Sequence, residues 1–143
     1  MTLHFAPTGV FSETEYWKRQ FPDDVIAQLA KNGVECCDRN GLPLEDIDPV
    51  PVVRLFRADG RWEWLLCYTD PNDPDRAFCL ANLGRGAELG DVRISELKTV
   101  RGALRLPLEH DRLFEGTTSI STYRGIQMAP LVPQPLRNQS TAV

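Results

Sequence analysis

The sequence predicts an α+β protein whose N-terminal helices pack on a mainly antiparallel meander sheet of four or five strands. Residues 12–33 carry helix-start signals and helically spaced apolar residues, and residues 50–110 contain strand-like runs separated by turns. The 143 residues, 42% hydrophobic and 25% charged, have the size and composition of one globular domain. We expect a domain over residues 1–128 and a flexible, proline-rich tail over residues 129–143.

Two helix starts lie close together near the N-terminus. Ser12–Glu15 has the capping-box pattern, in which a serine hydroxyl and a glutamate carboxylate satisfy backbone donors, so a helix is predicted to run to about Gln20. Pro22–Asp24 supplies a first-turn proline and acids that favour the helix dipole. Apolar residues then recur at helical spacing, namely Val25, Ile26 and Leu29. Lys31 and Gly33 are predicted to end this second helix.

A β-hairpin is predicted next. The runs Val52–Phe56 and Trp62–Tyr68 flank an Asp-Gly turn at Ala58–Arg61. Spacing of two predicts that one face of the second strand carries a stripe of large side chains. Its members are Trp62, Trp64, Leu66 and Tyr68.

The remaining strands are predicted between turns. The segment Asp70–Asp75 holds two prolines and is predicted to be a connecting loop. Strands are expected around Ala77–Leu83 and Leu89–Ile94, after which Ser95 is expected to cap a single helical turn. Alternating leucines over Leu104–Leu108 predict an edge strand, which Pro107 would limit.

No apolar run approaches the roughly 20 residues that span a bilayer, and the N-terminus lacks a signal-peptide pattern, so a cytoplasmic protein without membrane contact is expected. The four cysteines fit this compartment as small buried hydrophobes. Cys36-Cys37 has no zinc-like spacing, and only two histidines exist, His4 and His110. We therefore expect no metal and no other cofactor.

Charge is distributed unevenly along the chain. The formal net charge is −4, but residues 22–48 have a balance of −5 and residues 93–137 a balance of +3. Such asymmetry can steer a charged partner. The candidate partner-binding residues are the acids of the Asp70–Asp75 segment and the arginines from Arg93 onward, namely Asp70, Asp73, Asp75, Arg93, Arg101 and Arg105.

Two further kinds of site have candidate residues. Glu109-His110-Asp111, together with Glu88, has the side-chain types of a divalent-metal-dependent nuclease or other hydrolase. In an extended segment His110 points away from Glu109 and Asp111, so the three side chains cannot meet on one ion without a turn. The arginines beyond Arg93 are also a partial match to a DNA-binding regulator.

The stretch Val50–Tyr123 contains a series of motifs, which include Pro51–Phe56, Trp62–Leu66, Asp70–Asp75, Glu88–Val92 and Leu106–Asp111. In their order and spacing these motifs resemble DUF2958, a bacterial family of unknown function found on plasmids, integrative elements and phages. Two positions depart from the family pattern: Tyr68 stands where a glutamate is usual, and His110 where an arginine is usual. The arginine usual at that position implies a salt-bridged structural loop rather than a catalytic site.

The resemblance implies a mobile-element accessory protein but brings no established reaction, cofactor or catalytic residue. Together with the absence of a convincing catalytic motif, it favours a non-enzymatic protein that binds a protein partner. A counter-defence factor that blocks a nuclease or a CRISPR effector subunit is the leading hypothesis. The hydrolase and the DNA-binding regulator remain alternatives.

Overall fold

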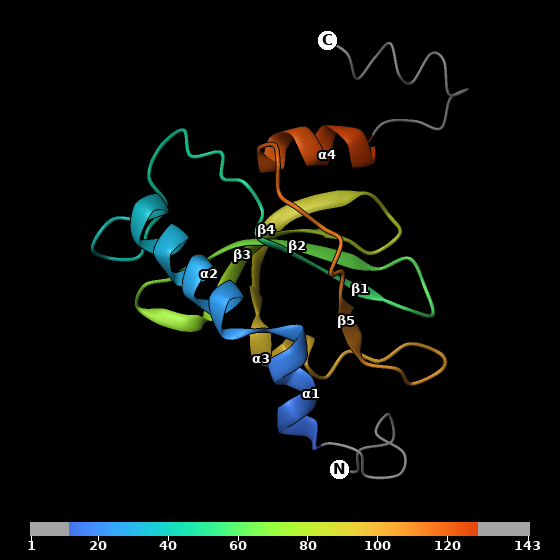
Figure 1. The fold of residues 1–143 in the computed structure, drawn as a ribbon. Helices are drawn as coiled ribbons and strands as arrows, with labels where there is room; N and C mark the ends of the chain where they lie inside the picture. Colours follow the sequence, from blue (N-terminus) through green and yellow to red (C-terminus); the bar gives the residue numbers. More distant parts are fainter. Residues whose placement is uncertain (1–11, 129–143) are drawn as a thin grey trace.

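The computed structural model describes residues 12–128 and confirms the predicted α+β fold (Figure 1). The elements are α1 (Glu13–Gln20), α2 (Asp23–Cys36), β1 (Val53–Arg57), β2 (Glu63–Asp70), β3 (Asp73–Asn82), β4 (Ala87–Arg93), α3 (Ile94–Leu97), β5 (Leu108–His110) and α4 (Ile120–Met128). The predicted proline-rich tail and His4 lie outside the described residues. No helix within residues 12–128 is long and apolar enough to cross a membrane.

The five strands form one antiparallel sheet in the order β4-β3-β2-β1-β5. The first four strands are the predicted meander, and β5 returns to pair with β1 through Leu55 and His110. The edge strand expected over Leu104–Leu108 begins only at Leu108. Its first residues instead form a turn, in which Arg105 has a φ of 59° and its N–H donates to the Gly102 carbonyl.

Each face of the sheet has its own hydrophobic cluster. Helices α1, α2 and α3 cover one face, where Trp17, Leu29 and Leu97 pack on Leu55 and Trp64. On the other face, α4 places Ile120 and Tyr123 in a cluster with buried strand residues, which include Leu65, Cys67 and Leu80. Figure 1 shows α4 on the opposite side of the sheet from α1 and α3.

A bulge in β2 alters the predicted aromatic stripe. Pairing with β3 shifts register between Leu66 and Tyr68. Trp64 and Leu66 lie in the cluster under the N-terminal helices, as predicted, but Tyr68 joins the cluster on the α4 side and stacks on Phe78 with ring centroids 5.2 Å apart. The prediction for Tyr68 was wrong because a bulge adds one residue and breaks the alternation.

The Asp70–Asp75 segment is mostly strand, so its prediction as a loop was also wrong. β2 continues through Asp70, β3 begins at Asp73, and only two residues separate them. The proline at position 74 is tolerated because β4 pairs with β3 only from Arg76 onward, so no ladder bond to β4 is needed at Pro74.

Helix α1 has the predicted bounds and capping box, whereas α2 runs past Gly33 to Cys36. β1 pairs with β2 only as far as Leu66, and α2 packs beside the rest of β2. There the Asn32 side chain donates to the Cys67 carbonyl at 3.0 Å, and a Cβ on Gly33 would collide with the Thr69 carbonyl. Gly33 therefore permits a close backbone approach and does not end the helix.

Candidate docking site

Three of the predicted partner-binding residues pair with one another. The Arg93 guanidinium lies 2.9 Å from an Asp73 oxygen and 3.2 Å from an Asp75 oxygen. Ser95, predicted as a helix cap, lies inside α3, and its hydroxyl and N–H donate to Asp75 at 2.7 and 2.9 Å. The hydroxyl contact is the main reason that the pKa of Asp75 is lowered. These ion pairs and hydrogen bonds hold the start of β3 beside the end of β4 and the start of α3.

Asp70 also takes part in local contacts. Its carboxylate accepts the Asn72 N–H at 2.8 Å in the hairpin turn and lies 3.7 Å from Arg76, which pairs with Asp91 at 2.8 Å. Arg101 donates to the carbonyls of Lys98 and Val100. Arg105 is exposed, and among residues 12–128 its side chain has no ion pair.

The four residues of the hydrolase alternative lie at opposite edges of the sheet. Glu88 is on β4, whereas Glu109 and His110 are on β5, with three strands between them. Asp111 lies 3.1 Å from Arg54, which also pairs with Glu63 at 2.8 Å. Within residues 12–128 no three acidic, histidine or cysteine side chains are placed to hold a metal ion.

His110 links β5 to α1. Its N–H donates to the Gln20 side chain at 2.8 Å, and its Nδ1 is buried without a hydrogen-bond partner among residues 12–128. Burial lowers the pKa of the imidazole, and Arg112 lowers it further, so the ring is neutral at pH 7. This position ties the edge strand to the helical layer.

All four cysteines are free thiols. Burial raises the pKa of each: that of Cys79 rises to about 12, and those of Cys36, Cys37 and Cys67 are also raised. A raised pKa keeps a thiol protonated and weakly reactive at neutral pH. The cysteines therefore act in packing in this fold.

The segment from Leu42 to Val50, here called the acidic–apolar loop, is the most exposed apolar stretch between α2 and β1. Four of its large apolar side chains are 37–59% exposed: Leu42, Leu44, Ile47 and Val50. Three exposed acids alternate with them: Glu45, Asp46 and Asp48. The apolar residues of this segment and the −5 balance of residues 22–48 are visible in the sequence, whereas the exposure of the apolar side chains is not.

The acidic–apolar loop is anchored at both ends. Near α2 the Leu44 N–H donates to the Cys36 carbonyl at 2.9 Å, and Cys37 forms a bridge with Pro43. At the other end Asp48 accepts the Ser121 hydroxyl and the Ser121 N–H, the latter at 3.0 Å, so its carboxylate caps the first turn of α4. The hydroxyl contact is the main cause that lowers the pKa of Asp48.

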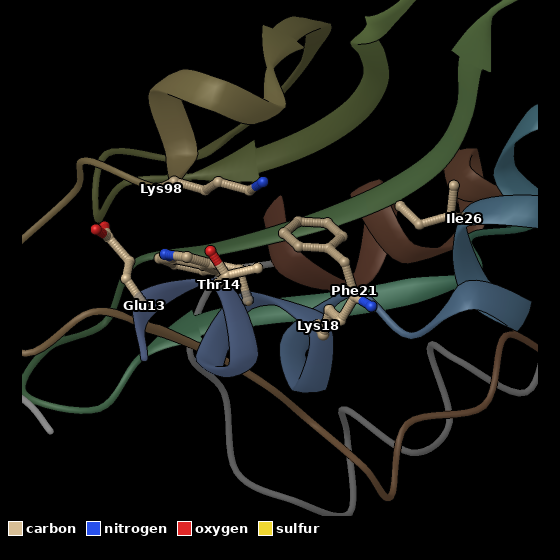
Figure 2. Close-up of a pocket in the computed structure, with 7 residues that line it drawn as sticks. Glu13, Thr14, Lys18, Phe21, Ile26 and Lys98 are labelled. Atoms are coloured by element: carbon tan, nitrogen blue, oxygen red, sulfur yellow. The ribbon is translucent and has the colours of Figure 1, made fainter. Parts of the chain in front are cut away.

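A groove of about 430 Å³ lies among the N-terminal helices and is here called the helical groove. Its lining residues are Glu13, Thr14, Trp17, Lys18, Phe21, Ile26 and Lys98. Figure 2 shows the Phe21 ring between Lys98, which extends from the α3 end, and Lys18 of α1. The Lys98 ammonium lies 5.9 Å from the ring centroid, and the buried Trp17 Nε1 has no acceptor among residues 12–128.

The groove therefore combines an apolar floor with donors. Neither Lys18 nor Lys98 has a carboxylate partner within residues 12–128. Glu13 is the one acid among the lining residues, and Figure 2 places it at the end opposite Ile26. Such a surface suits a segment that carries both apolar and acidic side chains.

Comparison with known proteins gives one match. The model of a family described as "Protein of unknown function (DUF2958)" matches residues 21–130. No curated protein and no solved structure matches the chain. The matched stretch begins before the Val50–Tyr123 region that carries the sequence resemblance, so it includes α2 and the acidic–apolar loop. Since the match covers well over half of the 143 residues, this chain belongs to the DUF2958 family.

Proposed function

We propose that the chain is a non-enzymatic protein-binding factor of a mobile element, which acts in counter-defence by docking on a host nuclease or a CRISPR effector subunit. The observation that carries the proposal is the acidic–apolar loop, in which exposed Leu42, Leu44, Ile47 and Val50 alternate with acids. Fully burying one such apolar side chain contributes about 1.5–3 kcal/mol. Covering the exposed part of all four would contribute about 3–5 kcal/mol to a complex.

The loop's charge indicates the kind of surface that it would meet. Proteins that cleave or hold DNA do so through basic surfaces. Glu45 and Asp46 are exposed and have no ion pair within the described part of the chain, so they remain available to a cationic partner. By contrast, Asp73, Asp75 and Arg93 pair with one another, which makes them weaker candidates.

The loop's anchoring also supports docking. A segment that is already held in place loses less conformational entropy when it binds. The contacts of Leu44 with Cys36 and of Asp48 with Ser121 supply such restraint. The mobile-element setting comes from the family resemblance and explains why a host defence enzyme is the expected partner.

Inhibition assays with purified restriction nucleases and CRISPR effectors test the proposal. We expect the wild-type chain to inhibit at least one of them, and Leu44→Ser/Ile47→Ser and Glu45→Lys/Asp46→Lys each to weaken inhibition about tenfold or more. The matched control is Leu104→Ser, which alters a leucine 69% exposed in the turn before β5. Inhibition that survives both loop variants, or no inhibition of any enzyme in the panel, would contradict the proposal.

A further inference from the structure

The helical groove and the acidic–apolar loop have complementary chemistry. The groove places the Phe21 ring between the side chains of Lys98 and Lys18, and Ile26 lies beyond that ring. The loop places the acids Glu45 and Asp46 between the apolar side chains of Leu44 and Ile47. All four of these loop residues are exposed. Opposite charges beside apolar side chains are a pattern by which protein surfaces select each other.

One copy of the chain cannot make this contact with itself. Ile26 lies in the first turn of α2, whereas the loop follows the last turn of this 14-residue helix, about 15 Å farther along its axis. The loop is also held away from the groove, because Asp48 is bonded to Ser121 at the start of α4. The loop must therefore meet the groove of another molecule.

We infer that the acidic–apolar loop of one copy docks in the helical groove of a second copy, so that the chain associates head to tail. This inference rests on the proposed function, because it takes the loop to be a docking element. It adds a second copy of the chain as another partner of the loop. A head-to-tail contact uses two different surfaces, so an open assembly keeps a free loop at one end and a free groove at the other. Such assemblies extend into short chains or close into rings. A foreign partner that takes the loop competes with this contact.

The contact would be weak. A groove of about 430 Å³ accepts only a few side chains, and small interfaces of this kind belong to the transient class. We expect a dissociation constant between about 10 µM and 1 mM. Because two ammonium groups meet two carboxylates, association should also weaken at high ionic strength.

Sedimentation equilibrium of the full chain over this concentration range tests the inference. The groove variant Lys18→Glu/Lys98→Glu and the loop variant Glu45→Lys/Asp46→Lys should each be monomeric at concentrations where the wild type associates. An equimolar mixture of the two should associate again, because each acidic surface then meets a basic one. Lys31→Glu, an exposed α2 residue outside the groove, is the matched control and should leave association unchanged.

A wild-type chain that stays monomeric at 1 mM would overturn the inference, as would association unaffected by either pair of substitutions or a mixture that fails to recover. Matching amide spectra of variants and wild type exclude misfolding as the reason for a loss. The assay contains no foreign protein, so a failure here is distinct from a failure of the inhibition assay. Nuclease inhibition without self-association would leave the proposed function in place and remove only this inference.

Discussion

Replacing Gly33 with alanine should destabilise the protein, although the same change usually stabilises a helix. Alanine has about 1 kcal/mol more helix propensity than glycine. At Gly33 the new methyl group would collide with the Thr69 backbone, and a backbone neighbour cannot turn away as a side chain can. Overpacking of this kind costs about 1–3 kcal/mol, and displacing α2 would weaken the Asn32 bond to Cys67, worth about 1 kcal/mol more. We expect a net loss of about 1–3 kcal/mol.

Gly125→Ala in α4 is the matched control. A Cβ at Gly125 meets nothing within 4 Å, so this substitution should stabilise the protein by about 0.5–1 kcal/mol. In thermal unfolding followed by circular dichroism, the midpoint should fall by about 3–10 °C for Gly33→Ala and rise by a few degrees for Gly125→Ala. A Gly33→Ala protein as stable as the wild type would refute the close approach of α2 and β2.

Four other substitutions test the contacts around the sheet. Asp48→Asn should lower the free energy of unfolding at pH 7 by about 1 kcal/mol. Because the pKa of Asp48 is lowered in the folded protein, the stabilisation by its carboxylate is present above about pH 4 and is lost as the pH falls through the folded-state pKa. Acid titration of the wild type and of this variant checks both expectations. His110 has a lowered pKa, so wild-type stability should fall as the pH drops below about 6.5, and His110→Gln should flatten that part of a chemical-denaturation profile. Arg54→Leu removes the half-buried ion pairs with Glu63 and Asp111 and should lower the free energy of unfolding by about 1–3 kcal/mol in the same denaturation assay. Arg93→Gln removes more exposed ion pairs and should lower it by less than Arg54→Leu does. Equal losses would contradict the difference in burial between the two sites.

Local signals predicted much of the fold. The capping box at Ser12–Glu15 and the Asp-Gly turn at Ala58–Arg61 each depend on a few adjacent residues, and both elements formed where expected. The features that escaped prediction depend on distant partners. Gly33 looked like a helix end because the Thr69 carbonyl that requires a glycine there is 36 residues away. The bulge beside Tyr68 leaves no mark in the local alternation.

The candidate site was predicted less well than the fold, for a related reason. A sequence shows which residues are charged, but it does not show which of them form ion pairs with one another. Asp73, Asp75 and Arg93 were proposed as contacts for a partner, and the structure shows that they also form ion pairs with one another. In the acidic–apolar loop the apolar residues were visible, yet only the structure shows that Leu42 and Leu44 remain exposed. Exposure depends on what the rest of the chain covers.

Hydrogen–deuterium exchange on the chain, alone and bound to a nuclease or CRISPR effector found in the inhibition assays, tests the central claim most directly. If the acidic–apolar loop docks, amide exchange over residues 42–50 should slow on binding, while exchange in the Asp73–Arg93 hairpin should stay the same. Glu45→Lys/Asp46→Lys should remove the protection together with the inhibition. Protection confined to β3 and β4, with residues 42–50 unchanged, would contradict the assignment of the loop as the docking site.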